Sequence, residues 1–175
     1  MDLDGLRWSR ESGAGPLSPV GFLPGRANPA GMVDLMETFI EDRNRIQPHH
    51  ANNLGTTHGG NVLHWMDETG AMSAMRFAGR ACVTAHIDSV DFELPLEIGD
   101  IALLEAYVYG AGRSSVRVRV RAYAEDPLTG ERERTTESYF VFVAIDEDRT
   151  PAAVPELTVA TEEGERLREE ALGKE

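Results

Sequence analysis

The run from Gly60 to Ala78 carries apolar side chains around nearly the whole circumference of a helix. Its apolar members are Val62, Leu63, Trp65, Met66, Ala71, Met72, Ala74, Met75 and Phe77. A helix that is apolar on all faces is a buried helix, and Gly79, directly after the run, is a typical C-terminal stop. The pattern therefore predicts one long helix at the centre of the fold, which the rest of the chain has to enclose.

Strand patterns supply that enclosure. Apolar and polar side chains alternate, wholly or in part, in five segments: residues 32–42, 82–92, 101–111, 114–126 and 135–148. Turn residues between Asp126 and Glu131 join the last two segments into a hairpin, and strands with short connections pair antiparallel. The predicted architecture is α+β, with a five-stranded antiparallel sheet wrapped around the long central helix.

One of these strands has a second pattern that allows two interpretations. Val116, Val118 and Val120 alternate with Arg117, Arg119 and Arg121. The arginine row resembles a basic binding stripe, but it also fits the solvated face of a sheet whose valine face is buried. We expect the solvated face.

The length of 175 residues suits one domain, which we expect to span residues 32–175. Residues 1–31 are rich in Gly, Pro, Ser and Arg without a sustained period, and predict a flexible N-terminal leader. Residues 162–172 predict a charged helix on the surface at the C-terminal end. The single cysteine, Cys82, allows no internal disulfide and fits a reducing cytoplasm.

The charge and the apolar content exclude two classes of partner. A net charge of −13 argues against nucleic acid, because binding to phosphates needs a basic surface. The chain contains no apolar run long enough to span a membrane. Lys174 is the sole lysine among 17 basic residues, which fits either a halophilic protein or a genome that favours arginine codons.

Two adjacent acids, Asp67 and Glu68, interrupt the apolar run about two turns after its start. A buried, unpaired carboxylate costs several kcal/mol, so their presence needs a reason. An acid can face solvent or pair with His64 or Arg76, or it can project into a cleft as a base or nucleophile. A metal site with the histidines is a third reading, but their spacing matches no known ligand motif, so we expect no metal.

Gly59 and Gly60 come directly before the helix in the sequence THGGN. The first N–H groups of a helix have no partner inside it, so they can donate to a carbonyl oxygen that gains negative charge. A helix start of this kind, together with a carboxylate, can support acyl transfer. The alternative is a tight turn that leads into the helix.

The stretch HANNLGTTHGGNVLHWMDETGAMSA, residues 50–74, resembles the signature of hotdog-fold acyl-CoA thioesterases, the group of the bacterial YciA-type and the mammalian cytosolic and brown-fat-inducible enzymes. The positions that carry the likeness are Asn52, Gly55, His58, Gly59, Gly60, Asp67, Glu68 and Gly70. The likeness continues through residues 90–100, the turn and strand from Gly112, and the strand that ends at Asp148. It implies a homodimer, or a trimer of dimers, that hydrolyses acyl-CoA to free acid and coenzyme A.

The resemblance also implies roles for individual residues. Asp67 is the expected general base or nucleophile, and Asn52 of the partner subunit is expected to orient the water or the thioester. Backbone N–H groups at Gly59 or Gly60 are expected to polarise the thioester carbonyl, and His58 either supports the loop that presents Asn52 or touches substrate. No cofactor is implied, because coenzyme A is part of the substrate.

Contacts to coenzyme A are expected from Arg113, Ser114 and Ser115, with Arg80 as a further phosphate ligand. A polar turn between two strands is the alternative for residues 113–115. Two other functions use the same residues. A hotdog enoyl-CoA hydratase or dehydratase would pair His58 with Asp67, and a non-catalytic acyl-CoA sensor would bind without turnover.

Overall fold

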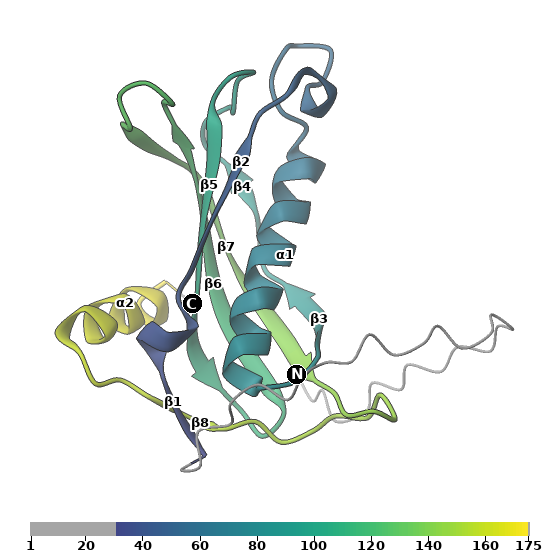
Figure 1. The fold of residues 1–175 in the computed structure, drawn as a ribbon, viewed down its shortest axis with the longest axis vertical. Helices are drawn as coiled ribbons and strands as arrows, with labels where there is room; N and C mark the ends of the chain where they lie inside the picture. Colours follow the sequence, from purple (N-terminus) through teal and green to yellow (C-terminus); the bar gives the residue numbers. More distant parts are fainter. Residues whose placement is uncertain (1–30, 175) are drawn as a thin grey trace, which may run out of the picture.

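The computed structural model describes residues 31–174 and packs the predicted central helix, α1 (Gly59–Ala78), against one face of a curled sheet (Figure 1). The helix begins one residue before the predicted start. It ends where the sequence predicts, because Gly79 adopts a left-handed conformation with φ 64° and donates its N–H to the carbonyl of Met75. The predicted leader, residues 1–31, lies outside the described residues except for Gly31 and stays a prediction.

Five strands form the main path of the sheet in the order β2 (Ile40–Arg45), β5 (Ile101–Ala111), β6 (Ser115–Glu125), β7 (Arg132–Ala144) and β3 (Cys82–Ile87). All neighbours on this path are antiparallel, and the two-residue strand β4 (Asp91–Phe92) also pairs with β7. The α+β architecture with a sheet curled around a central helix is therefore confirmed. β3 pairs with β7 instead of its successor β5, because the long connection through β4 carries the chain across the sheet.

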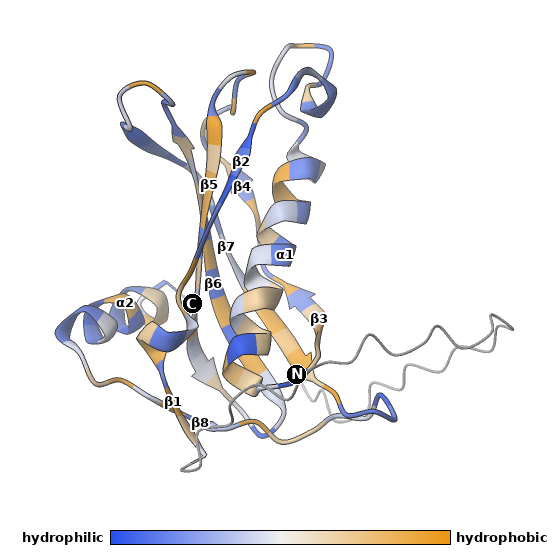
Figure 2. Ribbon diagram, in the orientation of Figure 1, coloured by the Kyte–Doolittle hydropathy of each residue, from blue (hydrophilic) through white to orange (hydrophobic). Residues whose placement is uncertain are grey.

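The core lies between α1 and the inner face of the sheet and consists of buried apolar side chains. Figure 2, which colours the ribbon by hydropathy, shows hydrophobic stretches in orange along the strands of this sheet. The valine row of β6 points into this core as predicted, and Val116, Val118 and Val120 are fully buried. Gly70 lets the helix approach the sheet closely. A Cβ atom at that position would lie 3.1 Å from both Phe142 and Val120.

The prediction of one strand over residues 32–42 is wrong. The segment divides into β1 (Met32–Asp34), a 3-10 turn η1 (Leu35–Thr38) and the start of β2. The Asp34 carboxylate accepts the N–H of Met36 at 2.9 Å, and this local cap favours the turn over an extended chain. β1 pairs in parallel with β8 (Glu156–Thr158), a short strand that the sequence pattern did not predict.

The prediction that the arginine row faces solvent is also wrong at its central member. The C-terminal helix α2 (Glu162–Leu172), found at its predicted residues, covers the outer face of the sheet (Figure 1). Arg119 is therefore only 2% exposed. Its guanidinium donates to the Tyr107 hydroxyl at 2.8 Å and to Glu137 Oε2 at 3.0 Å. The Tyr107 hydroxyl in turn donates to the carbonyl of Leu167 in α2 at 2.9 Å.

We expect Arg119→Ala to lower the free energy of unfolding by about 3 kcal/mol, because removing one partner of a buried ion pair leaves the other without compensation. Burial raises the pKa of Glu137, but hydrogen bonds from Lys174 and Arg119 outweigh it, so the folded-state pKa is lowered. A lowered pKa contributes stability above the ordinary pKa of glutamate, and that stability is lost as the pH falls through the folded value.

Urea unfolding at neutral pH and below about pH 4 measures both effects. The difference in free energy of unfolding between the wild-type protein and the Arg119 variant should be smaller in acid than at neutral pH. Arg166→Ala is the control, because Arg166 is exposed on α2, where it pairs with Glu163 and Glu170. Its loss is expected to lower the free energy of unfolding only slightly, because exposed ion pairs contribute little to stability. Equal curves for the two variants at neutral pH would refute a structural role for the buried arginine.

Candidate functional site

Asp67 projects from the middle of α1 toward the edge strand β3. Its Oδ1 atom accepts a hydrogen bond of 2.6 Å from the hydroxyl of Thr84, which lies on β3. The Asp67 and Thr84 side chains are both partly exposed. The hydroxyl fixes the orientation of the carboxylate while the side chain stays partly open to solvent. The sequence did not reveal Thr84, because a threonine in a strand is ordinary and its contact depends on how β3 packs against α1.

The Glu68 side chain points in a different direction from that of Asp67, since neighbouring residues of a helix point about 100° apart. Its side chain is 61% exposed and lies 3.5 Å from His64, one helical turn earlier. Arg76 instead donates to the carbonyl of Phe39 at 3.1 Å. The interpretation of an acid that faces solvent and pairs with His64 therefore applies to Glu68. Asp67 is instead held where α1 packs against β3.

Asn52 lies in a tight loop between the 3-10 turn η2 (Pro48–His50) and α1. Its side-chain oxygen accepts the N–H of Leu54 at 2.8 Å, and its amide nitrogen donates to the Thr56 hydroxyl at 3.0 Å. Gly55 completes the loop with a φ of 84°, a conformation that favours glycine. In the described chain no hydrogen bond joins Asn52 to Asp67.

His58 precedes the first turn of α1 and ties that turn to the Asn52 loop through its backbone. Its N–H donates to the carbonyl of His50 at 3.0 Å, and its own carbonyl accepts the N–H of Asn61 at 2.9 Å. The Asn61 side chain donates to the same His50 carbonyl at 3.0 Å. The imidazole of His58 is exposed and makes no capping hydrogen bond.

Gly59 and Gly60 open the helix, so their N–H groups have no intrahelical acceptor. A Cβ atom at Gly60 would meet nothing within 4 Å, whereas at Gly59 it would lie 3.1 Å from the ring of Phe92. Gly59 stands eight residues before Asp67, which is about 12 Å along the helix axis. One acyl group cannot contact both in the same chain. The structure therefore presents two half-sites, one at the start of α1 and one in its middle.

The residues expected to contact coenzyme A lie together at the opposite end of the sheet, where α1 ends. The last residues of β7 connect them, because Ala144 donates to the carbonyl of Ser114 and Ile145 donates to the carbonyl of Ala81, both at 2.9 Å. Arg80 and Arg113 are exposed at this end. Ser115 closes the β5–β6 turn by accepting the N–H of Gly112 at 2.9 Å.

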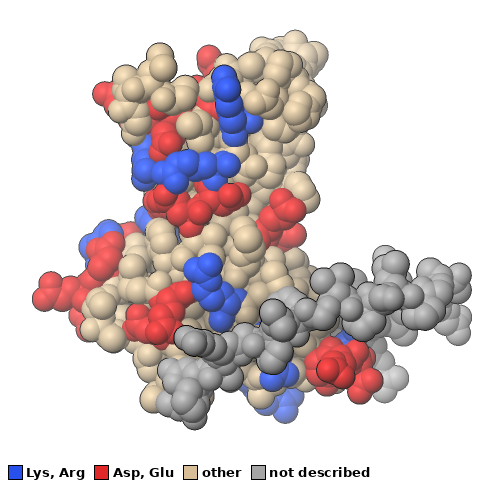
Figure 3. All heavy atoms as spheres, viewed as in Figure 1, with Lys and Arg blue, Asp and Glu red and all other residues tan. Residues whose placement is uncertain are grey.

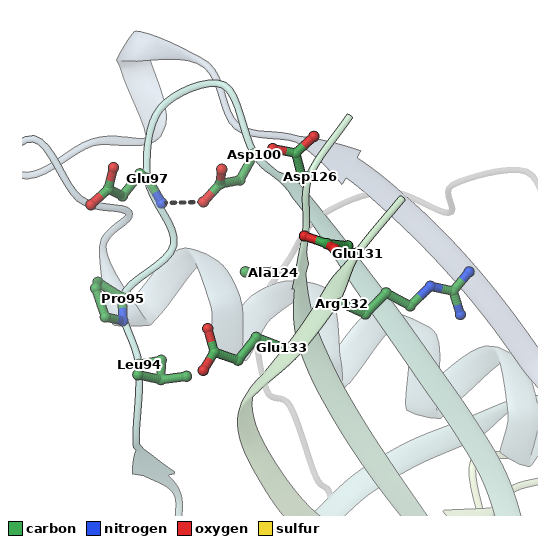
Figure 4. A pocket seen from close by; sticks show the side chains of 9 residues that line it. All are labelled: Leu94, Pro95, Glu97, Asp100, Ala124, Asp126, Glu131, Arg132 and Glu133. Carbon is green, nitrogen blue, oxygen red and sulfur yellow. Dashed lines mark hydrogen bonds between the residues drawn. The ribbon is translucent and has the colours of Figure 1, made fainter. Parts of the chain in front are cut away.

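The end of the sheet that carries the Asn52 loop has the opposite charge. A cavity of about 810 Å³ between the β6–β7 turn and the loop before β5 is lined by several carboxylates and one arginine (Figure 4). The acidic residues are Glu97, Asp100, Asp126, Glu131 and Glu133. The backbone N–H of Glu97 donates to Asp100 Oδ2 at 2.9 Å. This cavity is unsuited to the phosphates of coenzyme A, since carboxylates repel them.

Metal-ligating side chains do not converge in the described part of the chain. Among residues 31–174 there is no group of three or more His, Cys, Asp or Glu residues placed to hold a metal ion. His50, which lies next to His49, packs the edge of its ring against Trp65 with centroids 5.0 Å apart. No helix within residues 31–174 combines the length and the apolar character needed to cross a membrane.

Comparison with known proteins adds sequence relatives. Residues 54–131 match the family model of the thioesterase superfamily. The chain is 38% identical over 136 residues to the uncharacterized acyl-CoA thioester hydrolase YkhA of Bacillus subtilis, covering 78% of this chain and 79% of that protein. It is 30% identical over 147 residues to mouse acyl-coenzyme A thioesterase 11, covering 83% of this chain but only 25% of the mouse protein.

Several solved structures resemble this chain in both fold and sequence. An apo-hexameric acyl-CoA thioesterase is 41% identical with a TM-score of 0.75, covering 82% of this chain and 92% of that one. The acyl-CoA hydrolase of Staphylococcus aureus, solved with butyryl-coenzyme A, coenzyme A and coenzyme A disulfide, is 31% identical with a TM-score of 0.76, covering 82% and 87%. It has also been solved with alanine in place of an asparagine, an aspartate or a threonine. Sequence relatives, fold and motif agree that the chain belongs to the thioesterase superfamily and has the hotdog fold of its acyl-CoA thioesterases.

Proposed function

We propose that the protein hydrolyses acyl-CoA thioesters to free acid and coenzyme A in a site shared by two subunits. The observation that carries this proposal is the Asp67 carboxylate, held by the Thr84 hydroxyl at 2.6 Å in a partly exposed position about two turns from the helix start. A thioester is an activated acyl group, so a carboxylate and an oxyanion donor suffice for its hydrolysis, without a metal or a cofactor.

Each site combines the half-sites of two chains. β3 lies at an edge of the sheet, next to Asp67. Two subunits that join through this edge about a two-fold axis place their α1 helices side by side and antiparallel, so the start of one helix approaches the middle of the other. Asn52 and the helix start then come from one subunit, and Asp67 with Thr84 from its partner. We propose a homodimer of this kind, with a trimer of dimers as the larger assembly, since two similar thioesterases are hexamers.

The chemistry follows from these positions. The thioester oxygen lies at the N–H groups of Gly59 and Gly60, and Asn52 orients the water or the thioester. Asp67 takes a proton from water, the hydroxide attacks the carbonyl carbon, and the C–S bond of the tetrahedral intermediate breaks. The thiolate leaves and receives the proton. In the alternative, Asp67 attacks the carbonyl carbon directly, the C–S bond breaks and coenzyme A leaves as the thiolate, which takes up a proton. Water then cleaves the resulting anhydride, which releases the free acid and regenerates the Asp67 carboxylate.

The variants of the Staphylococcus aureus hydrolase support this set of residues. By their numbering, its altered asparagine, aspartate and threonine stand fifteen and seventeen residues apart in that order. Asn52, Asp67 and Thr84 have the same two spacings. Thr84 thus joins the proposed site as the group that orients the catalytic carboxylate.

Coenzyme A binds with its phosphates toward Arg80 and Arg113, at the end of the sheet where α1 ends. Exposed guanidinium groups suit phosphate oxygens, and the Ser114 and Ser115 hydroxyls add hydrogen-bond donors. The acid-lined cavity at the other end of the sheet disfavours the reverse orientation. His58 acts through its backbone, which holds the Asn52 loop against the helix start.

A comparison of two substrates tests the reaction. We expect the wild-type protein to release free thiol from butyryl-CoA, measured with a thiol reagent. Hydration of crotonyl-CoA without thiol release would favour the hydratase, and binding of either compound without turnover would favour the sensor. The hydratase is disfavoured within one chain, because His58 precedes Asp67 by about 13 Å along the helix.

Two features suggest the setting of this reaction. The single cysteine, Cys82, fits a reducing cytoplasm. Burial raises the pKa of its thiol to about 12, so it is a poor nucleophile. The net charge of −13 and the interleaved acids and arginines of the surface (Figure 3) fit an environment of high salt, where screening reduces self-repulsion.

A further inference from the structure

A cavity of about 300 Å³ opens beside the start of α1 and shares Gly59 with the proposed oxyanion half-site. Its apolar walls come from Val62 on the helix and from Phe92, Leu94 and Leu96 on the segment around β4. Polar side chains complete the lining: Thr56, Thr57, Glu93 and Thr135. The ring of Phe92 lies over Gly59. Proposed catalysis uses only the backbone of Gly59 here, so the cavity itself has no assigned role.

We propose that this cavity receives the acyl chain of the substrate and that Phe92 determines which chain lengths fit. The inference rests on the proposed function, in which Gly59 or Gly60 holds the thioester oxygen. The carbon that bears this oxygen also bears the acyl chain, so the chain must begin within a few ångströms of Gly59. The apolar side chains that line the cavity beside Gly59 offer the acyl chain contacts that remove its surface from water.

The far wall of the cavity limits the chain. Leu94 and Pro95 line both this cavity and the acid-lined cavity of Figure 4. A methyl end that passed this wall would enter a space lined mostly by charged side chains, where it gains fewer apolar contacts. A volume of about 300 Å³ is at the lower end of the range for small-molecule sites. The preferred substrates are therefore short- to medium-chain acyl-CoAs.

Phe92 is placed to act as an adjustable wall. Its backbone is fixed because β4 pairs with β7, and the Thr136 hydroxyl donates to the carbonyl of Asp91 at 2.7 Å. Its side chain is 51% exposed, so the ring shapes the cavity without supporting the core. A smaller side chain enlarges the cavity, and a larger one narrows it.

Steady-state kinetics on acyl-CoAs from acetyl to palmitoyl test this inference. For Phe92→Ala we expect the ratio of kcat/KM for lauroyl-CoA to that for butyryl-CoA to rise by about tenfold, since a few methylenes in an apolar pocket discriminate by such factors. Phe92→Trp retains an aromatic side chain and is expected to shift the preference toward shorter chains.

Leu128→Ala is the matched control, because Leu128 is 94% exposed in the β6–β7 turn and should leave the profile unchanged. Unaltered chain-length profiles in both Phe92 variants would overturn the inference while leaving thioester hydrolysis intact. Failure of the proposed function gives a different result, namely no thiol release from any acyl-CoA by the wild-type protein.

Discussion

Replacing Asp67 with asparagine is expected to lower kcat for thiol release by about 10²–10⁴-fold, the usual contribution of a general base. Asparagine has nearly the same shape and its Oδ1 atom can still accept the Thr84 hydroxyl, so the junction of α1 and β3 is preserved. Only the capacity to take a proton or to attack as a carboxylate is lost. A thiol-release assay with butyryl-CoA measures the loss, and calorimetric titration with coenzyme A should show unchanged affinity.

The adjacent acid provides the control for this variant. Glu68→Gln removes the same charge from the next position, but Glu68 is exposed and pairs with the exposed His64. We expect it to keep wild-type turnover. Equal turnover in the two variants, or near-normal turnover in Asp67→Asn, would show that the base has been assigned to the wrong residue.

Asn52→Ala is expected to lower kcat by about 10²-fold, comparable with the loss of one positioned donor in an oxyanion site. The Asn52 side chain also holds its own loop, by accepting from Leu54 and donating to Thr56. Asn52→Asp separates the two roles, because a carboxylate still accepts the N–H of Leu54 but has no N–H to donate. If Asn52→Asp retained full activity, the amide donor would be unnecessary for catalysis and Asn52 would serve only to hold its loop.

The sequence predicted the elements that local patterns determine. The central helix and the hairpin of β6 and β7 depend on periodicity and turn residues within each segment. The division of residues 32–42 depends on a single side chain, Asp34, which caps a 3-10 turn. The burial of Arg119 depends on α2, about fifty residues later in the chain, and a strand pattern holds no information about what covers its outer face.

The candidate site was predictable to a similar extent. Asp67 stands out because a carboxylate is rare in an apolar helix, and the family resemblance supplied Asn52. Thr84 required the structure, since its role comes from the packing of β3 against the helix. The separation of the half-sites required only the rise per residue of a helix, which places Gly59 and Asp67 about 12 Å apart along the axis.

A mixing experiment tests the central claim that two subunits share each site. Asp67→Asn and Asn52→Ala are each expected to be nearly inactive alone. In a dimer that contains one of each, one site has both native residues and the other has neither. Dissociating and reassociating the two variants in equal amounts should therefore restore about a quarter of wild-type turnover, since half of the dimers are mixed and each has one intact site. Turnover no higher than the average of the two separate variants would contradict a shared site.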